Sequence, residues 1–236
     1  MKRPRLLWAA LLGGGMAAAP ESAAAQAKVG AQADLFSSYV WRGVSLTNRP
    51  VAQPSAYVTF PAGKATVLLG GWGSIDVGQY DDSSDDISES GGVGAFNFAE
   101  FDPYGEVSFP VGKATIAGGF VGYIFPNDLG LTEDFNTLEL YGKVGLSVPL
   151  SPTVAVYYDV GKVNGAYIQG TVGHTVPLSD KLSLSLGGLV GFSAGQAVDE
   201  SGEDNANFFD DGLTHLDLSA GLPLTAGVLS ITPTLH

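Results

Sequence analysis

Residues 33–54 read ADLFSSYVWRGVSLTNRPVAQP, and this stretch decides the fold class. In its first half the side chains alternate in polarity with a period of two, which predicts a β-strand with two different faces. An aromatic pair, Tyr39 and Trp41, stands beside Arg42 towards the end of this strand. A turn-rich segment containing Pro50 follows, and a second alternating run then begins near residue 52.

The same plan repeats along the whole chain. Eleven alternating strands are expected, at 29–42, 52–60, 64–75, 95–109, 114–125, 137–148, 153–161, 166–176, 182–193, 213–222 and 227–236. The connections alternate in length, with tight turns at 61–63, 110–112, 150–152, 178–181 and 223–226 and the other loops at 43–51, 76–94, 126–136, 162–165 and 194–212. Short turns at one end and mostly long loops at the other predict an all-β fold, an antiparallel up-and-down transmembrane β-barrel.

Eleven strands raise a problem of parity, because bacterial single-chain barrels have even strand numbers. We therefore expect a barrel of twelve strands, with the chain continuing past His236. A soluble β-sandwich would also alternate in polarity. It would, however, carry charge on its exposed faces and has no reason to sort its loops by length.

The first 27 residues predict export from the cytoplasm. Lys2, Arg3 and Arg5 precede a short apolar run, and Ala25-Gln26-Ala27 has the pattern of a cleavage site. We expect a signal peptide at 1–27, a barrel domain at 28–236 and residence in the outer membrane of a Gram-negative bacterium. Removal of 1–27 would change the net charge from −13 to −15, which excludes nucleic-acid binding through a basic surface.

Charged residues of the predicted strands fall on the polar, inward face. The expected lumen acids are Asp34, Glu100, Asp102, Glu106, Glu139, Asp159 and Asp217, and the expected lumen bases are Arg42, Lys64 and Lys143. Carboxylates along a pore favour cations. The alternative is a set of salt bridges that plugs a narrow barrel, and the sequence favours neither.

Several other residue groups have a functional and a structural interpretation. His215 and Asp217 on one strand face, with serines of 182–193, could form a hydrolase set acting on lipid, although Ser and Thr line barrel interiors in general. Acids at 81–89 and 199–204 could bind calcium, but their spacing favours a solvated surface. Trp72 could stack on sugars. His174 is expected to face lipid, and aromatic rims are expected at Tyr39, Trp41, Phe60 and Phe109.

The stretch also resembles the TorF-like porin family of outer-membrane proteins. The resemblance rests on Asp34, Tyr39, Trp41-Arg42-Gly43, Pro50 and Gln53-Pro54, with weaker matches around Glu100, Tyr123, Glu139, Tyr157 and Tyr167. It implies a barrel and a porin-like role, and it assigns no catalytic residue, cofactor or metal. The resulting expectation is a channel for passive passage of small solutes or ions, surrounded by outer-membrane lipid. The alternatives are a lipid hydrolase and a structural or adhesive barrel with a plugged lumen.

Overall fold

The computed structural model describes residues 9–10, 14–15, 27–77, 96–126, 136–197 and 207–236. The regular secondary structure in these ranges is β throughout. No helix in the described part of the chain is long and apolar enough to cross a membrane.

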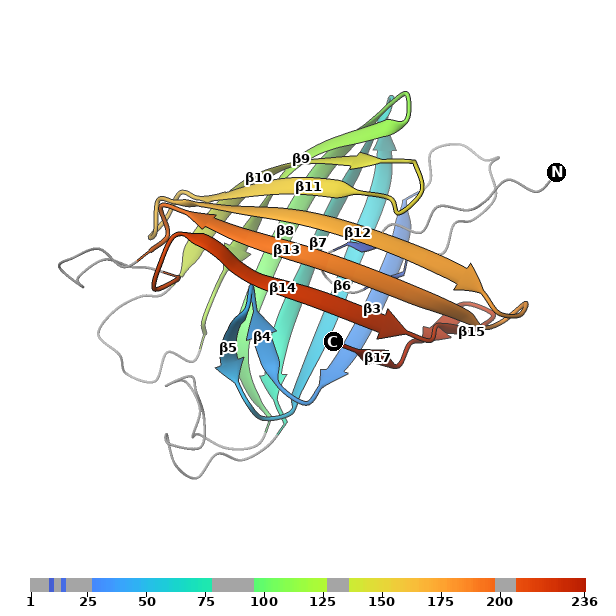
Figure 1. The fold of residues 1–236 in the computed structure, drawn as a ribbon, viewed down its shortest axis with the longest axis horizontal. Coiled ribbons are helices and arrows are strands. Elements are labelled where there is room, and N and C mark those ends of the chain that lie inside the picture. Colours follow the sequence, from blue (N-terminus) through green and yellow to red (C-terminus); the bar gives the residue numbers. More distant parts are fainter. Residues whose placement is uncertain (1–8, 11–13, 16–26, 78–95, 127–135, 198–206) are drawn as a thin grey trace.

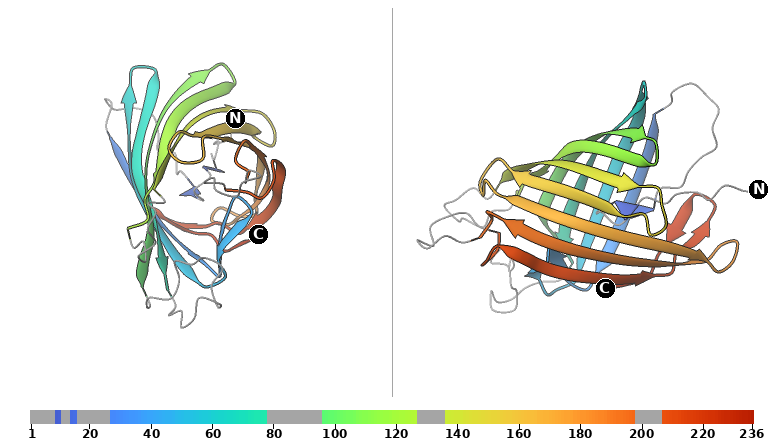
Figure 2. Two further views of the ribbon diagram at one scale, coloured as in Figure 1. Left: turned by 90° about the vertical axis from the view of Figure 1, so that its left-hand side faces the viewer. Right: turned by 45° about the horizontal axis from the view of Figure 1, so that its top comes forward.

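One antiparallel sheet of eleven strands dominates the described residues, in the order β17-β14-β13-β12-β11-β10-β9-β8-β7-β6-β3. Its strands are β3 (Lys28–Phe36), β6 (Val51–Ala62), β7 (Ala65–Asp76), β8 (Asn97–Val111), β9 (Ala114–Tyr123), β10 (Thr137–Leu146), β11 (Thr153–Asp159), β12 (Ala166–Pro177), β13 (Ser183–Ala194), β14 (Gly212–Gly221) and β17 (Thr234–Leu235). Neighbouring strands of this sheet are also successive along the chain, apart from the small hairpins inserted after β3 and after β14. The topology is therefore an up-and-down meander. Figures 1 and 2 show the sheet curled around a central space.

Within the described ranges, three small hairpins accompany the main sheet. They pair β1 (Ala9–Ala10) with β2 (Gly14–Gly15), β4 (Tyr39–Trp41) with β5 (Val44–Thr47), and β15 (Leu224–Ala226) with β16 (Leu229–Ile231). The β4–β5 hairpin bends away from the main sheet towards the central space (Figure 2).

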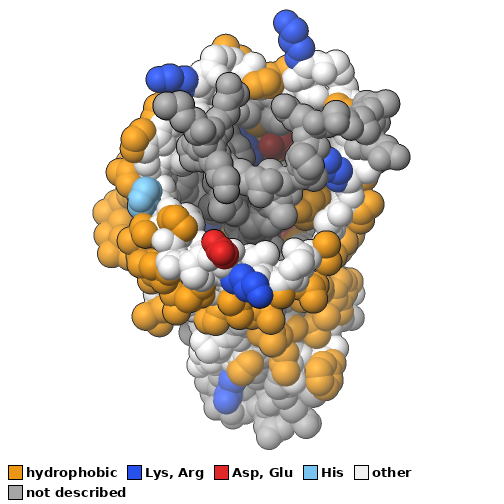
Figure 3. All heavy atoms as spheres, turned by 90° about the vertical axis from the view of Figure 1, so that its right-hand side faces the viewer, with side chains coloured by type: hydrophobic (Ala, Val, Ile, Leu, Met, Phe, Trp, Pro, Cys, Tyr) orange, Lys and Arg blue, Asp and Glu red, His pale blue; other side chains and the backbone are white. Residues whose placement is uncertain are grey.

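The two faces of the curled sheet have opposite chemistry. On β10, Leu140 is 49% exposed on the convex face, whereas its neighbour Glu139 is 1% exposed on the concave face. The same alternation continues through Val154 and Val156 outside and Asp159 inside. Figure 3, a view of the end that carries the short turns, shows hydrophobic side chains around the outer flank of a hollowed end. The sheet is therefore apolar outside and polar inside.

The predicted strands between residues 52 and 222 are confirmed to within a few residues. So are tight turns, such as Gly63-Lys64 between β6 and β7 and Gly112-Lys113 between β8 and β9. The face assignment also holds: Glu100, Asp102, Glu106, Glu139 and Asp159 lie on the concave side. His174 lies on the exposed outer side.

The prediction of one strand at 29–42 was wrong. β3 ends at Phe36, whose ladder partner Val51 is the first residue of β6, so the ladder has no further partner beyond this point. The chain bends at Ser37-Ser38 and returns as the separate β4–β5 hairpin. Tyr39, Trp41 and Arg42 consequently belong to the hairpin and not to a wall strand.

The prediction of one strand at 227–236 was also wrong. Only β17 joins the main sheet, through Ala220↔Leu235 and Gly221↔Thr234, while Leu229–Ile231 pairs with β15. Pro223 and Pro233 account for this, because a proline has no N–H to donate to a central ladder.

Backbone pairing does not close the sheet within the described residues, since β3 pairs with β6 and β17 with β14. The two edges nevertheless approach each other. The Phe36 ring at the end of β3 meets the His236 ring edge-on, with centroids 6.5 Å apart. His236 also contacts the carboxylate of Asp217 on β14 at 3.1 Å.

Candidate functional site

The β4–β5 hairpin places Arg42 at its tip. Trp41 and Val44 pair across a two-residue turn, and both turn residues have positive φ, 50° at Arg42 and 85° at Gly43. This is the signature of a type I′ hairpin turn, which glycine accepts readily and a long side chain accepts at a cost. Gly43 also lies close against the His215 side chain, where a Cβ atom would come 2.6 Å from His215 Cβ. The turn is therefore seated against β14.

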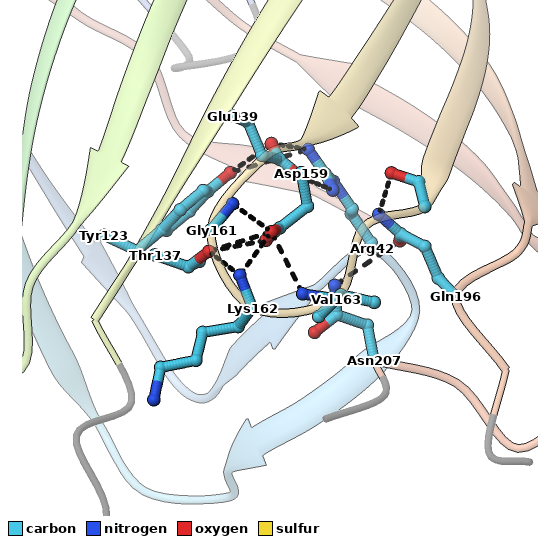
Figure 4. A network of polar contacts seen from close by, with 11 residues as sticks. Arg42, Tyr123, Thr137, Glu139, Asp159, Gly161, Lys162, Val163, Gln196 and Asn207 are labelled. Carbon is cyan, nitrogen blue, oxygen red and sulfur yellow. Dashed lines mark hydrogen bonds and ion pairs between the residues drawn. The ribbon is translucent and has the colours of Figure 1, made fainter. Parts of the chain in front are cut away.

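Arg42 forms a two-pronged ion pair with Glu139 of β10. Nη1 and Nη2 donate to Oε1 and Oε2, each at 2.6 Å (Figure 4). The Tyr123 hydroxyl of β9 donates to Oε2 at 2.9 Å and lies 3.5 Å from Nη2. The two side chains are 9% and 1% exposed. Buried, bidentate and charge-assisted hydrogen bonds of this kind are the strong ones in proteins.

Aromatic rings enclose the same guanidinium. Its carbon lies 4.2 Å from the Tyr167 ring centroid, 4.9 Å from Tyr157 and 4.5 Å from Trp41. Phe208 stacks on both Trp41 and Tyr167, with centroids 6.3 Å and 6.2 Å apart. We call Glu139, Tyr123, Tyr157 and Tyr167 the guanidinium cage. A cation over aromatic faces gains about 2 kcal/mol or more when it is desolvated.

A second polar cluster lies further along β10 towards the short turns. Lys143 Nζ contacts Glu106 Oε2 at 2.5 Å, and the Tyr141 hydroxyl donates to the same oxygen at 2.8 Å. The Lys143 and Glu106 side chains are 30% and 15% exposed, so this pair is more accessible to solvent than the Arg42–Glu139 pair. Both expected lumen bases that face inward are thus neutralised by expected lumen acids.

Glu100 and Asp102 form a separate acidic patch on β8. They are 3% and 7% exposed, and their ladder partners on β7 are Ser74 and Trp72. Asp102 Oδ1 has no hydrogen-bond partner among the described residues. Trp72 packs against Tyr39 of the hairpin, with ring centroids 5.8 Å apart. This packing accounts for the inward tryptophan without a bound sugar.

The other predicted lumen residues have local roles. Asp159 accepts from Thr137 Oγ1 and from the N–H groups of Gly161, Lys162 and Val163, so it fastens the tight connection after β11 (Figure 4). Asp34 accepts from Gln32, and Asp217 pairs with His236. Lys64 lies exposed in the turn after β6 and is not part of the lumen cluster.

The rim assignment of Tyr39 and Trp41 was wrong, because both rings pack inward, Tyr39 against Trp72 and Trp41 against Tyr123. The reason is the break after β3, which carries them off the wall. Phe109 does lie exposed on the outer face near a short turn.

The structure does not assemble the hypothetical hydrolase set. His215 Nδ1 lies 3.0 Å from Thr214 Oγ1, and the His215 ring stacks on Tyr167. Asp217 contacts His236, and the Ser193 hydroxyl donates to Asp211 at 2.8 Å. Within the described ranges no three His, Asp or Glu side chains gather as metal ligands. The acids at 81–89 and 199–204 lie outside the described residues.

The cage contains residues that the sequence did not mark as a site. Tyr123, Tyr157 and Tyr167 appeared only as weak family matches. Phe208, which stacks on Tyr167 next to the cage, did not appear at all. Their periodicity shows that the three tyrosines face inward, but not that they meet, since they come from β9, β11 and β12. No local pattern in the sequence indicates that the β4–β5 hairpin contacts these tyrosines.

Comparison with known proteins identifies a family. Residues 19–229 match the family described as "Bacterial protein of unknown function (Gcw_chp)". No curated protein matches the chain. Because the match covers most of the sequence, the chain belongs to the Gcw_chp family of bacterial proteins.

Proposed function

We propose that this protein is a transmembrane β-barrel of the Gram-negative outer membrane that forms a narrow, cation-preferring passage for small solutes. The β4–β5 hairpin constricts the passage from within. The resemblance of residues 34–54 to the TorF-like porins agrees with this role.

The observation that carries the proposal is the inverted polarity of the curled sheet. Leu140, Val144 and Val154 are 43–55% exposed on the convex face, while Glu139 and Asp159 are 1% exposed on the concave face. In water this arrangement would expose a broad aliphatic surface, which soluble monomers avoid. In a bilayer the same surface is matched to the lipid, and the polar side chains line the lumen.

Closure of the barrel is part of the proposal. β3 and β17 end the sheet, and β14 pairs on that side only where β17 meets Ala220 and Gly221. Free edges of this kind in hydrocarbon would leave backbone N–H and C=O groups without partners. The approach of Phe36 and His236 brings these edges near one another. A closed barrel with an even number of strands, as is usual in bacterial outer membranes, would satisfy them.

Cation preference is proposed because the inward side chains without an ionic partner are acidic. Arg42 and Lys143 are paired with Glu139 and Glu106. Asp34, Glu100, Asp102 and Asp159 have no base paired to them in the described residues, so every member of this set that is ionised adds negative charge. A low-dielectric wall focuses the field of such charges along a pore and raises the local cation concentration.

A specific observation also favours a second candidate, a structural barrel with a closed lumen. The hairpin contacts inward side chains of β7, β9, β10 and β12, and the Arg42–Glu139 pair fixes its tip. The two candidates differ in whether ions pass the hairpin.

Planar-bilayer recording tests both candidates. In a salt gradient the wild-type protein should carry current with a cation-selective reversal potential. Replacing Glu100 and Asp102 by Gln and Asn should move that potential towards zero, whereas Asp180→Asn in an exposed turn should leave it unchanged. Anion preference of the wild-type protein would refute the proposal. Absence of current in both the wild type and Arg42→Ala would favour the closed barrel.

A further inference from the structure

We propose that the guanidinium cage is a recognition site for the guanidinium group of a small solute, and that Arg42 of the chain's own hairpin occupies it as an internal competitor. This inference rests on the proposed channel, because the solute would reach the cage through the lumen.

The cage and its occupant belong to different parts of the fold. Glu139, Tyr157 and Tyr167 stand on β10, β11 and β12, which are held in register by continuous ladders. Arg42 stands on a hairpin whose strands pair with each other in a two-stranded sheet of their own. The wall would therefore keep its shape if the guanidinium left it.

The chemistry of the wall suits a guanidinium better than an ammonium ion. Both carboxylate oxygens of Glu139 accept from separate nitrogens at 2.6 Å, which requires the planar fork of a guanidinium. The Tyr157 and Tyr167 rings lie 4.9 Å and 4.2 Å from the guanidinium carbon, and a delocalised, weakly hydrated cation stacks well on such faces. An alkylammonium is a compact, strongly hydrated charge and would lose one of the two parallel hydrogen bonds.

Arg42 can be displaced from the cage by a solute, because side-chain contacts and not a backbone ladder hold the hairpin against the main sheet. A two-stranded hairpin is marginally stable by itself. β4 and β5 span only Tyr39–Trp41 and Val44–Thr47, and Arg42 has the unfavourable φ of 50°. A solute that binds the cage gains what Arg42 loses, so the two compete for one site.

Tryptophan fluorescence provides the test. Trp41 lies 4.5 Å from the guanidinium carbon, so occupation of the cage next to it should change its emission. The full chain, refolded in detergent, is titrated with ethylguanidinium chloride and, in parallel, with ethylammonium chloride at equal ionic strength. The variants are Arg42→Ala, which empties the cage, and Arg42→Ala/Glu139→Gln, which also removes the carboxylate.

We expect Arg42→Ala to bind ethylguanidinium saturably and at least fivefold more tightly than ethylammonium. The wild type should bind it more weakly than Arg42→Ala, since the tethered Arg42 competes at a high effective concentration. Arg42→Ala/Glu139→Gln should lose the preference. Equal binding of the two cations by Arg42→Ala, or an unchanged preference in the double variant, would overturn the inference.

If Arg42→Ala does not fold alone, its refolding yield becomes the readout. A higher yield with ethylguanidinium than with ethylammonium supports the site, and equal yields overturn it. The titration needs no current, so the two proposals fail separately. If the protein conducts ions but does not prefer ethylguanidinium over ethylammonium, the cage proposal is refuted. If it binds ethylguanidinium preferentially but carries no current, the channel proposal is refuted and the cage lies in a closed lumen.

Discussion

At the residue scale, the Arg42–Glu139 pair is expected to contribute most to the free energy of unfolding. Removing one partner of a buried pair leaves an uncompensated charge and costs about 3–5 kcal/mol. We therefore expect Arg42→Ala and Glu139→Ala each to lower the free energy of unfolding by that amount, measured by urea titration in detergent. The double variant should lose much less than the sum of the two.

Lys143 supplies the matched control. Its side chain is 30% exposed, and breaking such a pair costs up to about 1 kcal/mol. Lys143→Met should thus be far milder than Arg42→Ala. Equal losses for the two substitutions would mean that the hairpin tip is solvated and does not hold the interior together.

Asp211, before β14, yields a prediction about pH. The N–H of Gly195, the Ser193 hydroxyl and the N–H of Gln196 donate to this carboxylate and hold the pKa of Asp211 below its ordinary value. Because its pKa is lower in the folded protein than in the unfolded one, the charged form stabilises the loop above the unfolded pKa of about 3.9. This contribution is lost as the pH falls through the folded pKa.

Amide hydrogen exchange at Gly195 and Gln196 measures this contribution. Asp211→Asn should reduce the protection factors at neutral pH and should equal the wild type once the pH is well below about 3.9. Asp210→Asn makes the same change of charge one residue earlier and should leave both amides protected. Identical effects of the two variants would make the interaction a general charge effect.

For individual residues, the sequence predicted which side of the sheet each side chain faces. Alternation assigned Glu100, Glu139 and Asp159 to the interior, and the structure agrees. It could not pair Arg42 with Glu139, because 97 residues separate them and the contact depends on where the hairpin points. It could not distinguish Asp159, which accepts hydrogen bonds from a turn, from an acid that lines an open pore.

At the scale of strands, glycines opposite tyrosines are a repeated device. Tyr57, Tyr104 and Tyr141 face Gly30, Gly70 and Gly119 across the ladder, and each ring occupies the space where the glycine lacks a Cβ atom. Each ring can therefore lie against the backbone of the neighbouring strand.

Gly119→Ala tests this device. A Cβ atom at this position would collide with the backbone oxygen of Gly105 and with the Tyr141 ring. Overpacking of this kind costs about 1–3 kcal/mol. Gly118→Ala is the control, because its Cβ would meet its nearest neighbour, the oxygen of Tyr141, at 3.6 Å. Its unfolding free energy should stay within about 0.5 kcal/mol of the wild type.

The two wrong strand predictions have a common cause. Alternation continues through 29–42 and 227–236, so a window of polarity cannot detect where pairing stops. At Phe36 the partner strand has ended, and near residue 233 a proline interrupts the ladder. Partner length and proline placement outweigh local polarity at both positions.

At the scale of the whole molecule, one distribution of side chains underlies the proposed function. An apolar convex face, a polar concave face and a hairpin fastened on the concave side are the three features from which we propose a membrane barrel with a constricted lumen. The sequence predicted the first two features because both follow from a period of two. The third depends on contacts between distant segments and required the structure.

The most direct test of this account places the convex face of β10 in lipid. The sequence contains no cysteine, so single cysteines at 138–146 can each carry a nitroxide label in liposome-reconstituted protein. Collision rates with oxygen and with a water-soluble nickel complex report lipid and water, respectively. If the convex face lies in lipid, oxygen collision rates should be high and nickel collision rates low at 138, 140, 144 and 146. Oxygen collision rates should be low at the inward positions 139, 141 and 143. Nickel collision rates at 140 and 144 as high as those of a label in water would contradict it.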